Sequence, residues 1–281
     1  MKIFCYHHSK DLDGLFSGAV VKYKYPEAEM CGFDYGDKVK LVEGYDLVIM
    51  ADISLPITML ERLKNTNKKF VWIDHHARTI REAEDEGREF DGIRDKDNEY
   101  SACVLTWKYL YPNESIPSVL YRVQDQDLWR FKLKDTEVIT AGIYTLYADN
   151  MEALVGIVDD YEVYYDDLWE AGTTILKQRE QQVNVTVANA EVKRWNGNTI
   201  GLSNTNSYMS NVGHELLKEN ISFAVVWHIK KGIASVSLRS SGKPDVSEIA
   251  SRYGGGGHPQ ASGFNMEAKK WFKEMEGMKN E

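Results

Sequence analysis

The chain has 281 residues, with 43 acidic against 34 basic side chains and a formal charge of −9 at pH 7. This length favours two domains, and the negative charge argues against a protein that wraps long nucleic acid with a generally basic surface. A hydrophobic content of 43% with only six prolines is typical of a folded globular protein, which excludes a disordered or fibrous chain.

Apolar runs alternate with helical patterns through the first half of the chain. Strands are predicted at residues 3–6, 47–51 and 70–73, and helices at residues 15–24, 58–64 and 102–111. This alternation is typical of strand–helix–strand units, so we predict an α/β fold with a doubly wound, mostly parallel sheet. The charged stretch at residues 82–98 is expected to form a solvated helix and loop.

A long polar segment without proline separates the two halves. Residues 161–190 are predicted to form a connector helix. Beyond it we predict strands at residues 199–203, 223–228 and 233–238, and helices at residues 212–217 and 246–253. The sequence thus predicts a two-lobed protein, with an N-terminal domain at 1–160 and a smaller C-terminal α/β domain at 191–281.

The cysteines and the N-terminus bear on the compartment. Cys5, Cys31 and Cys103 lack the paired spacing of a zinc site or a disulfide framework. The apolar run at the N-terminus is shorter than the ~7–15 residues of a signal peptide core, and no stretch approaches the ~18 apolar residues of a membrane span. We therefore expect a cytoplasmic protein with no membrane partner.

Acidic or imidazole side chains follow each predicted strand of the first half. They are His7 and His8, then Asp52, then Asp74, His75 and His76. In an open parallel sheet, ligands bind beyond the carboxyl ends of the strands, so these side chains should converge on one crevice. Converging carboxylates repel one another unless cations neutralise them, and the pattern therefore indicates a site for divalent metal.

Further carboxylates are available to such a site. Asp11 and Asp13 precede a predicted helix, where capping of the helix is an equally good interpretation. Asp125 and Asp127 lie on a predicted helix or turn, and the choice between them stays open. If one carboxylate bridges, the set is large enough for two ions. Its oxygen-rich donors suit Mn²⁺ best, with Mg²⁺ or Co²⁺ as alternatives.

Two sets of residues resemble those of the DHH phosphoesterases. The N-terminal set is His7, Asp11, Asp13, Asp52, Asp74, His75, His76 and Asp125. The second set lies at residues 237–241, 246–250 and 254–264, and it resembles the DHH-associated C-terminal domain of the oligoribonuclease, or nano-RNase, branch. The resemblance implies that residues 1–160 are the catalytic domain and that residues 191–281 bind substrate.

The resemblance also implies a role for each residue. It assigns one metal ion to His7, Asp11 and Asp52, and the other to Asp13, Asp52, His75 and Asp125. His76 would face the scissile phosphate, and Asp74 would orient an imidazole. His8 is left as a structural histidine. Substrate phosphate or the terminal nucleotide would be bound by Arg239, Ser240, Gly255, Gly256, Gly257 and His258.

The expected activity is manganese-dependent hydrolysis of very short RNA from its 3′ end to nucleoside monophosphates, by water activated between two metal ions. Short substrates fit a net-acidic protein, because long polymers depend on many phosphate contacts. The alternatives are a phosphodiesterase of cyclic or linear dinucleotides, a 3′-phosphoadenosine phosphate phosphatase, and a non-catalytic nucleotide sensor. Long duplex nucleic acid is not expected as a partner, and a homodimer is one assembly compatible with the sequence.

Overall fold

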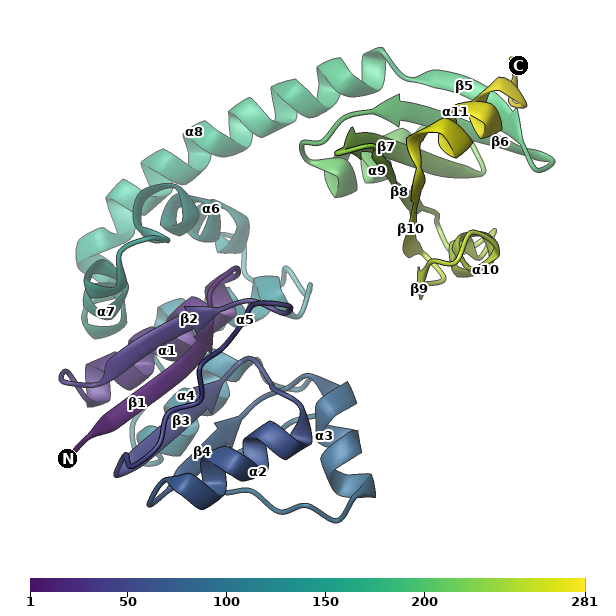
Figure 1. The fold of residues 1–281 in the computed structure, drawn as a ribbon. Helices are drawn as coiled ribbons and strands as arrows, with labels where there is room; N and C mark the ends of the chain where they lie inside the picture. The colour runs from purple at the N-terminus through teal and green to yellow at the C-terminus, as the bar shows by residue number, and fades with distance from the viewer. Residues whose placement is uncertain (281) are drawn as a thin grey trace. The chain divides into compact units, whose positions relative to one another are not determined.

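Two sheets organise residues 1–280, which are the residues that the computed structural model describes (Figure 1). One sheet lies in a unit formed by residues 1–176, and the other in a unit that begins at residue 177. The long helix α8 (Tyr161–Ala188) runs from the first unit into the second. The predicted two-lobed α/β architecture with a helical connector is therefore confirmed. None of the helices described within these residues is long and apolar enough to cross a membrane.

The N-terminal sheet has four parallel strands in the order β2-β1-β3-β4. Their bounds are Ile3–His8 for β1, Glu29–Phe33 for β2, Leu47–Ala51 for β3 and Phe70–Ile73 for β4. Every residue of β3 and β4 is buried, as expected for parallel strands that are covered on both faces. The three predicted strands are all present. The unpredicted β2 is an edge strand in which only Phe33 is buried, so its sequence lacks a strong apolar pattern.

Helices cover both faces of this sheet. On one face α1 (Leu12–Lys24) and α4 (Ala102–Leu110) pack against the sheet through an apolar cluster that includes Val21, Ile49 and Leu105. On the other face α2 (Ile57–Thr66) and α3 (Ala77–Asp85) pack around Trp72. The helices α5 (Ser118–Asp127), α6 (Thr136–Tyr147) and α7 (Met151–Asp159) join the core around α1. The predicted doubly wound arrangement is thus confirmed.

The register of the sheet brings the strand ends level with one another. His7 pairs with Ala51 across β1 and β3, and Ala51 pairs with Ile73 across β3 and β4. Because the strands are parallel, the residues that follow these positions emerge at the same edge of the sheet. Asp52 and Asp74 are therefore neighbours at this edge.

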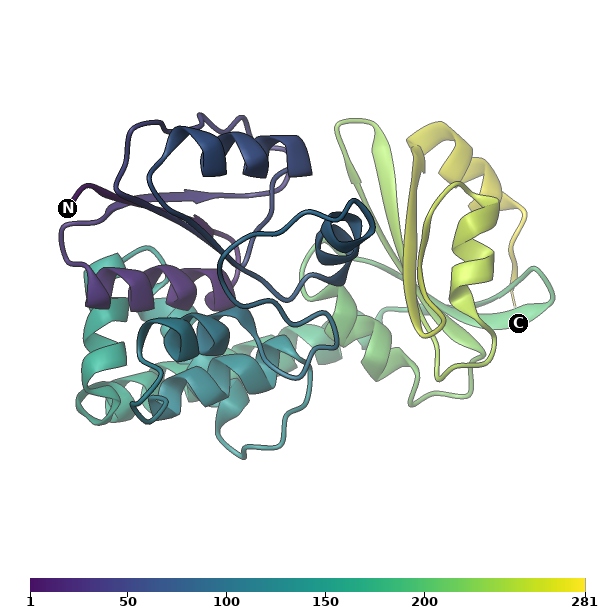
Figure 2. The same ribbon diagram turned by 90° about the horizontal axis from the view of Figure 1, so that it is seen from below.

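The C-terminal sheet has the order β11-β5-β6-β7-β8-β10-β9. Its strands are β5 (Glu191–Trp195), β6 (Asn198–Asn204), β7 (Phe223–Lys230), β8 (Ile233–Arg239), β9 (Gly256–His258), β10 (Ala261–Glu267) and β11 (Lys279–Asn280). Only the β6–β7 pair is parallel among those described. Helix α9 (Met209–Leu216) covers one face, whereas α10 (Val246–Arg252) and α11 (Ala268–Glu276) cover the other (Figure 2).

Candidate active site

Asp52 lies directly after β3 in an unfavourable environment for an isolated carboxylate. Its side chain is 1% exposed, and neither carboxylate oxygen has a hydrogen-bond partner within residues 1–280. Its backbone has φ +60°, a left-handed conformation that is uncommon outside glycine. Burial, followed by the charge of Asp13, raises the pKa of Asp52 well above its usual range. A buried and backbone-strained carboxylate that accepts no hydrogen bond is typical of a residue that binds a ligand.

His8 and Asp11 approach Asp52 from the first loop. His8 Nδ1 lies 2.5 Å from Asp11 Oδ2 and 3.6 Å from Asp52 Oδ2, and its Nε2 lies 3.1 Å from Asp34 Oδ1. The ion pairs with Asp11 and then with Asp52 raise the pKa of His8 to about 10. Gly14 lets α1 begin against this histidine, since a Cβ at Gly14 would lie 2.4 Å from the His8 carbonyl oxygen.

A second group forms around the imidazole of His75. Its Nε2 lies 3.4 Å from Asp52 Oδ1, 3.6 Å from Asp13 Oδ2 and 3.6 Å from Asp127 Oδ2. Burial alone would lower the pKa of His75, but the ion pair with Asp52 and the nearby charges of Asp13 and Asp127 outweigh it and raise this pKa to about 10. Burial and the charge of Asp13 raise the pKa of Asp127 to about 7. The crowded carboxylates therefore favour cations between them.

Asp13 is held in place by the start of helix α4. The backbone N–H groups of Ala102 and Cys103 donate to its two carboxylate oxygens at 2.7 and 2.9 Å. The first N–H groups of a helix have no partner within the helix, and a carboxylate placed there is stabilised by the helix dipole. The capping role that the sequence allowed is real for both aspartates, but they cap different helices: Asp11 caps α1, whereas Asp13, in the first turn of α1, caps α4.

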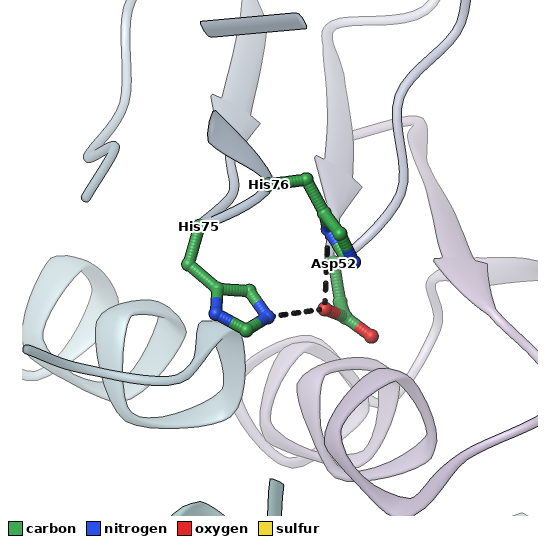
Figure 3. Close-up of side chains that lie close together, drawn as sticks. All are labelled: Asp52, His75 and His76. Carbon is green, nitrogen blue, oxygen red and sulfur yellow. Dashed lines mark ion pairs between the residues drawn. The ribbon is translucent and has the colours of Figure 1, made fainter. Parts of the chain in front are cut away.

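His76 completes the cluster from the far side of Asp52. Figure 3 shows the imidazoles of His75 and His76 directed at the same carboxylate, with His76 Nδ1 3.9 Å from Asp52 Oδ1. The same nitrogen lies 2.8 Å from Asp74 Oδ1. Asp74 is fully buried, and its other oxygen accepts from the Ser54 hydroxyl. Burial would raise the pKa of Asp74, but the hydrogen bond and charge of His76 outweigh it and lower this pKa.

These side chains make up one cluster with the properties of a divalent metal site. In each of three overlapping groups the ligand atoms lie within 4.8 Å of one another; Asp52 belongs to two of the groups, and His75 also belongs to two. The donors are the carboxylates of Asp11, Asp13, Asp52 and Asp127 and the imidazoles of His8, His75 and His76. The partnerless oxygens of Asp52 and this mixture of oxygen and nitrogen donors fit divalent cations. We call this set the His/Asp cluster.

Four of the six predicted metal residues meet in the His/Asp cluster, namely Asp11, Asp13, Asp52 and His75. His7 is not among them, and His8 takes its place. Successive side chains of a strand point to opposite faces, so only one of the two histidines can face the cluster. The ring of His7 is buried close to Gly18 and Gly32, its Nδ1 lies 2.9 Å from the His8 carbonyl oxygen, and burial lowers its pKa.

Asp125 is also outside the His/Asp cluster, where the structure places Asp127 instead. Residues two positions apart in a helix are separated by about 200° around its axis, so the carboxylates of Asp125 and Asp127 point to different sides of α5. Asp125 accepts from the N–H groups of Lys132 and Leu133 at 2.9 and 3.0 Å and from the Thr136 hydroxyl at 2.5 Å. Burial would raise the pKa of Asp125, but these hydrogen bonds outweigh it and lower this pKa.

The C-terminal unit contains a cavity of about 560 Å³ beside Arg239. The Arg239 guanidinium donates from Nη1 to the Ser237 hydroxyl at 2.9 Å and from Nη2 to the Ser210 hydroxyl at 2.8 Å. Gly255 and Gly256 line the same cavity. An arginine held in this way is suited to binding a phosphate with two parallel hydrogen bonds.

The other residues predicted to bind substrate occupy different positions in the same unit. Ser240, Gly257 and His258 do not belong to the lining of this cavity. Ser240 is buried, and its hydroxyl donates to the Pro259 carbonyl oxygen at 3.2 Å. His258 is exposed on β9. The glycine run also has a packing role, because a Cβ at Gly255 would lie 2.1 Å from the Gly263 carbonyl oxygen of β10.

Comparison with known proteins supports a relationship for both units. Residues 184–276 match the model of the DHHA1 domain. The chain is 26% identical over 285 residues to an uncharacterized protein of Acanthamoeba polyphaga mimivirus, and this match covers 92% of the chain but 66% of the viral protein, just under two thirds of its length. It is also 26% identical over 288 residues to the oligoribonuclease NrnB of Bacillus subtilis (strain 168), covering 93% of this chain and 72% of that protein.

A solved structure extends the likeness to the fold. The pGpG-specific phosphodiesterase PggH of Vibrio cholerae superposes with a TM-score of 0.60, at 14% identity, over 99% of this chain and 97% of that chain. At this identity the likeness concerns the fold. Together with the His/Asp cluster at the sheet edge, these matches supply the family context for the site.

Proposed function

We propose that this chain, a metal-dependent phosphoesterase of the DHH family with a DHHA1 domain, is a manganese-dependent phosphodiesterase of very short oligonucleotides. The proposed reaction releases nucleoside monophosphates from the 3′ end. One observation carries the proposal: three groups of candidate metal-binding side chains are linked in a row, two of them through Asp52 and two through His75, an arrangement suited to two ions held side by side.

The residues that would hold metal are assigned from the distances in the His/Asp cluster. His8, Asp11 and Asp52 form one set, and Asp13, Asp52, His75 and Asp127 form the other. When bound, divalent ions supply an activated water near neutral pH and neutralise charge on the phosphoryl oxygens. Asp52 belongs to both sets, so we assign it the bridging role. Mn²⁺ is preferred because carboxylates outnumber imidazoles and no thiolate takes part.

His76 would act on the phosphate itself. Asp74 binds Nδ1 of His76, which leaves Nε2 as the ring atom available to substrate. Burial would lower the pKa of His76, but the bond to Asp74 and its charge outweigh it and raise this pKa, which favours a protonated ring. A protonated imidazole can donate a hydrogen bond to a phosphoryl oxygen as negative charge develops there, or transfer a proton to the leaving ribose oxygen.

In the C-terminal unit, Arg239 and the neighbouring glycines would bind a second part of the substrate. The serine hydroxyls fix the guanidinium plane, so little side-chain freedom is lost when a phosphate binds. Gly255 and Gly256 leave the cavity wall without side chains, which allows close approach of backbone to an anion. We therefore assign this cavity to a substrate phosphate or the terminal nucleotide.

The net charge of the chain and its similarity to two known enzymes favour short substrates. A net charge of −9 gives little attraction to a polymer that depends on many phosphate contacts. Two similar proteins are named an oligoribonuclease and a pGpG-specific phosphodiesterase, and both names refer to small nucleic acid substrates. These names describe those proteins, and they support the substrate class proposed for this one.

The proposal is tested by comparing substrates of different length. The purified chain is incubated with Mn²⁺ and end-labelled pApA, pGpG or a long single-stranded RNA, and the products are identified by chromatography. We expect fast conversion of the dinucleotides to monophosphates and slow turnover of the long RNA. Loss of activity in Asp52→Ala and His75→Ala would link the reaction to the His/Asp cluster. Faster turnover of the long RNA would overturn the proposal.

A further inference from the structure

A pair of exposed aromatic side chains follows the last carboxylate of the His/Asp cluster. Trp129 is 66% exposed and Phe131 is 37% exposed. Their rings lie edge to face with centroids 4.9 Å apart. Exposed aromatic rings lose the hydrophobic stabilisation that burial would give them, so a neighbouring pair indicates a surface that binds something. We call Trp129 and Phe131 the aromatic pair.

The backbone that carries the aromatic pair is strained. Trp129 has φ +53° and Phe131 has φ +46°, and this left-handed conformation is unusual for bulky side chains. Asp125 imposes it: its carbonyl oxygen accepts from the N–H groups of Arg130 and Phe131 at 2.8 and 3.3 Å. Its carboxylate fixes the two residues that follow, as described above. Strain that the surroundings maintain in this way is a common feature of binding sites.

Hydrogen bonds connect the segment that carries the aromatic pair to the segment that holds the His/Asp cluster. Arg130 donates from Nη2 to the carbonyl oxygens of Asn98 and Glu99 at 2.9 and 3.0 Å. This segment leads into the start of α4, whose N–H groups hold Asp13 in the cluster. Trp129 is also only two residues from Asp127, a backbone span of at most about 7 Å. The rings are thus fixed close to the metal-binding side chains, within the same unit.

We propose that Trp129 and Phe131 form a stacking platform for a nucleobase next to the scissile phosphate. This inference rests on the proposed function and specifies its substrate further, because the platform requires a nucleotide with an unstacked base. Every base has an aromatic face, so stacking on the pair adds affinity with little preference for sequence. In an acidic protein, base stacking can also supply affinity that a basic groove supplies elsewhere.

The occupant is a nucleobase and not a second copy of the chain, because the pair adjoins the cluster where a phosphodiester would bind. A dinucleotide held by its phosphate at the cluster has a base within a short distance of that phosphate, and the face of one ring of the pair, braced edge to face by the other ring, offers an apolar surface for stacking there. Self-association through the rings is the competing use of the surface. It would appear as a change in sedimentation when Trp129 is replaced.

Kinetics of variants test the platform. Trp129→Ala should raise the KM for pApA about tenfold and leave kcat within about twofold, because stacking contributes to binding and not to the chemical step. Trp129→Phe should retain most of the affinity. The matched control is Trp169→Ala, which removes another exposed tryptophan, located on α8, and should change neither constant. An unchanged KM in both Trp129→Ala and Phe131→Ala would overturn the inference.

A substrate lacking a base separates stacking from a general loss of fit. Two pApA analogues are compared, each with one adenine replaced by hydrogen. For the analogue that lacks the base that stacks on the pair, the unmodified protein should already have a high KM, and Trp129→Ala should not raise this KM further. An equal increase for pApA and for both analogues would contradict the platform. Unaltered kinetics together with a change in sedimentation would assign the pair to self-association and also overturn it.

Binding without turnover distinguishes this inference from the proposed function. A non-hydrolysable methylene-bridged diadenosine should quench the fluorescence of the unmodified protein and that of Trp169→Phe, but not that of Trp129→Phe. If such binding occurs and no dinucleotide is hydrolysed, the platform stands and the proposed function fails. If dinucleotides are hydrolysed normally by Trp129→Ala and Phe131→Ala, the proposed function stands and the platform fails.

Discussion

Nδ1 of His76 lies 2.8 Å from Oδ1 of Asp74, and this same oxygen accepts the backbone N–H groups of His75 and His76 at 2.8 and 3.1 Å. One buried carboxylate oxygen therefore fixes both the turn after β4 and the ring of His76. The other oxygen is held by Ser54 and by the indole N–H of Trp72 at 3.2 Å. Asp74 thus contacts no metal-binding carboxylate, but it positions the two imidazoles that do.

Replacing Asp74 should therefore impair turnover more than metal binding. Asp74→Asn keeps the size of the side chain and one acceptor oxygen, but it removes the negative charge that holds the His76 proton. We expect kcat to fall about 100-fold, with a smaller loss of Mn²⁺ affinity. Steady-state kinetics and Mn²⁺ titration measure the two effects. Ser54→Ala, which removes a bond to the other oxygen only, should have a much smaller effect, and an unchanged kcat in Asp74→Asn would contradict this role.

The two adjacent histidines of β1 should respond in opposite ways to replacement. His8→Ala removes a side chain of the His/Asp cluster, so we expect Mn²⁺ affinity to fall at least about tenfold with little change in folding. His7→Ala removes a ring packed near Gly18 and Gly32, so we expect it to destabilise the fold by about 1–3 kcal/mol. Mn²⁺ titration and urea unfolding of both variants measure this. Loss of metal binding in His7→Ala with a normal His8→Ala would restore the assignment made from the sequence.

Asp127 and Asp125 form a second matched pair of variants. Asp127→Asn should weaken Mn²⁺ binding and activity, because its carboxylate approaches His75 in the cluster. Asp125→Asn should mainly destabilise the segment that carries Trp129 and Phe131, since an amide cannot replace all of the hydrogen bonds of the carboxylate. Mn²⁺ titration measures the loss of metal binding expected for Asp127→Asn, and urea unfolding measures the destabilisation expected for Asp125→Asn. Normal metal binding in Asp127→Asn would remove it from the cluster.

The fold was largely predictable from the sequence because its signals are local. The buried strands β1, β3 and β4 appear as continuous apolar runs, and a parallel sheet requires their ends to share one edge. The edge strand β2 gave no such signal. Its residues alternate weakly and are mostly exposed, since one side of the strand has no neighbour.

The metal-binding residues expected from the sequence differ from the His/Asp cluster at two places, by one position in β1 and by two positions in α5. His7 and His8 have the same chemistry, and a shift of one position in where β1 ends exchanges the faces that they occupy. Asp125 and Asp127 are likewise equivalent in sequence, and only the hydrogen bonds of Asp125 to residues after α5 distinguish them. Which residue of each pair faces the cluster depends on contacts between segments that are distant in the sequence. Local helical or strand periodicity does not report such contacts, so the pattern of residue types alone leaves the choice open.

Replacing Arg239 should change substrate binding without affecting the metal site. Arg239→Lys keeps the charge but loses the planar fork that Ser210 and Ser237 hold, so we expect the KM for pApA to rise about tenfold. The increase in Tm on adding Mn²⁺ should stay as in the unmodified protein, because the His/Asp cluster lies in the other unit. The exposed Arg252→Lys is the matched control. A KM that does not change would exclude Arg239 from substrate binding.

Stabilisation by Mn²⁺ should increase with pH. The pKa of Asp52 is raised in the folded chain without metal, so the stabilisation from its protonated form is present at low pH and is lost as the pH rises through the folded value. The raised pKa values of His8 and His75, both about 10, act in the same direction: protonation contributes stability below about pH 6.5, and this contribution disappears as the pH rises toward 10.

Metal binding requires these groups in their deprotonated forms, so Mn²⁺ must displace protons, and it displaces more of them at lower pH. We therefore expect the increase in Tm caused by Mn²⁺ to be larger near pH 8 than near pH 6, and binding to release protons. Thermal unfolding at both pH values, and calorimetry in buffers of different ionisation enthalpy, measure these effects. Asp52→Asn should abolish the increase in Tm at either pH. A larger increase at the lower pH would show that protons do not compete for the cluster.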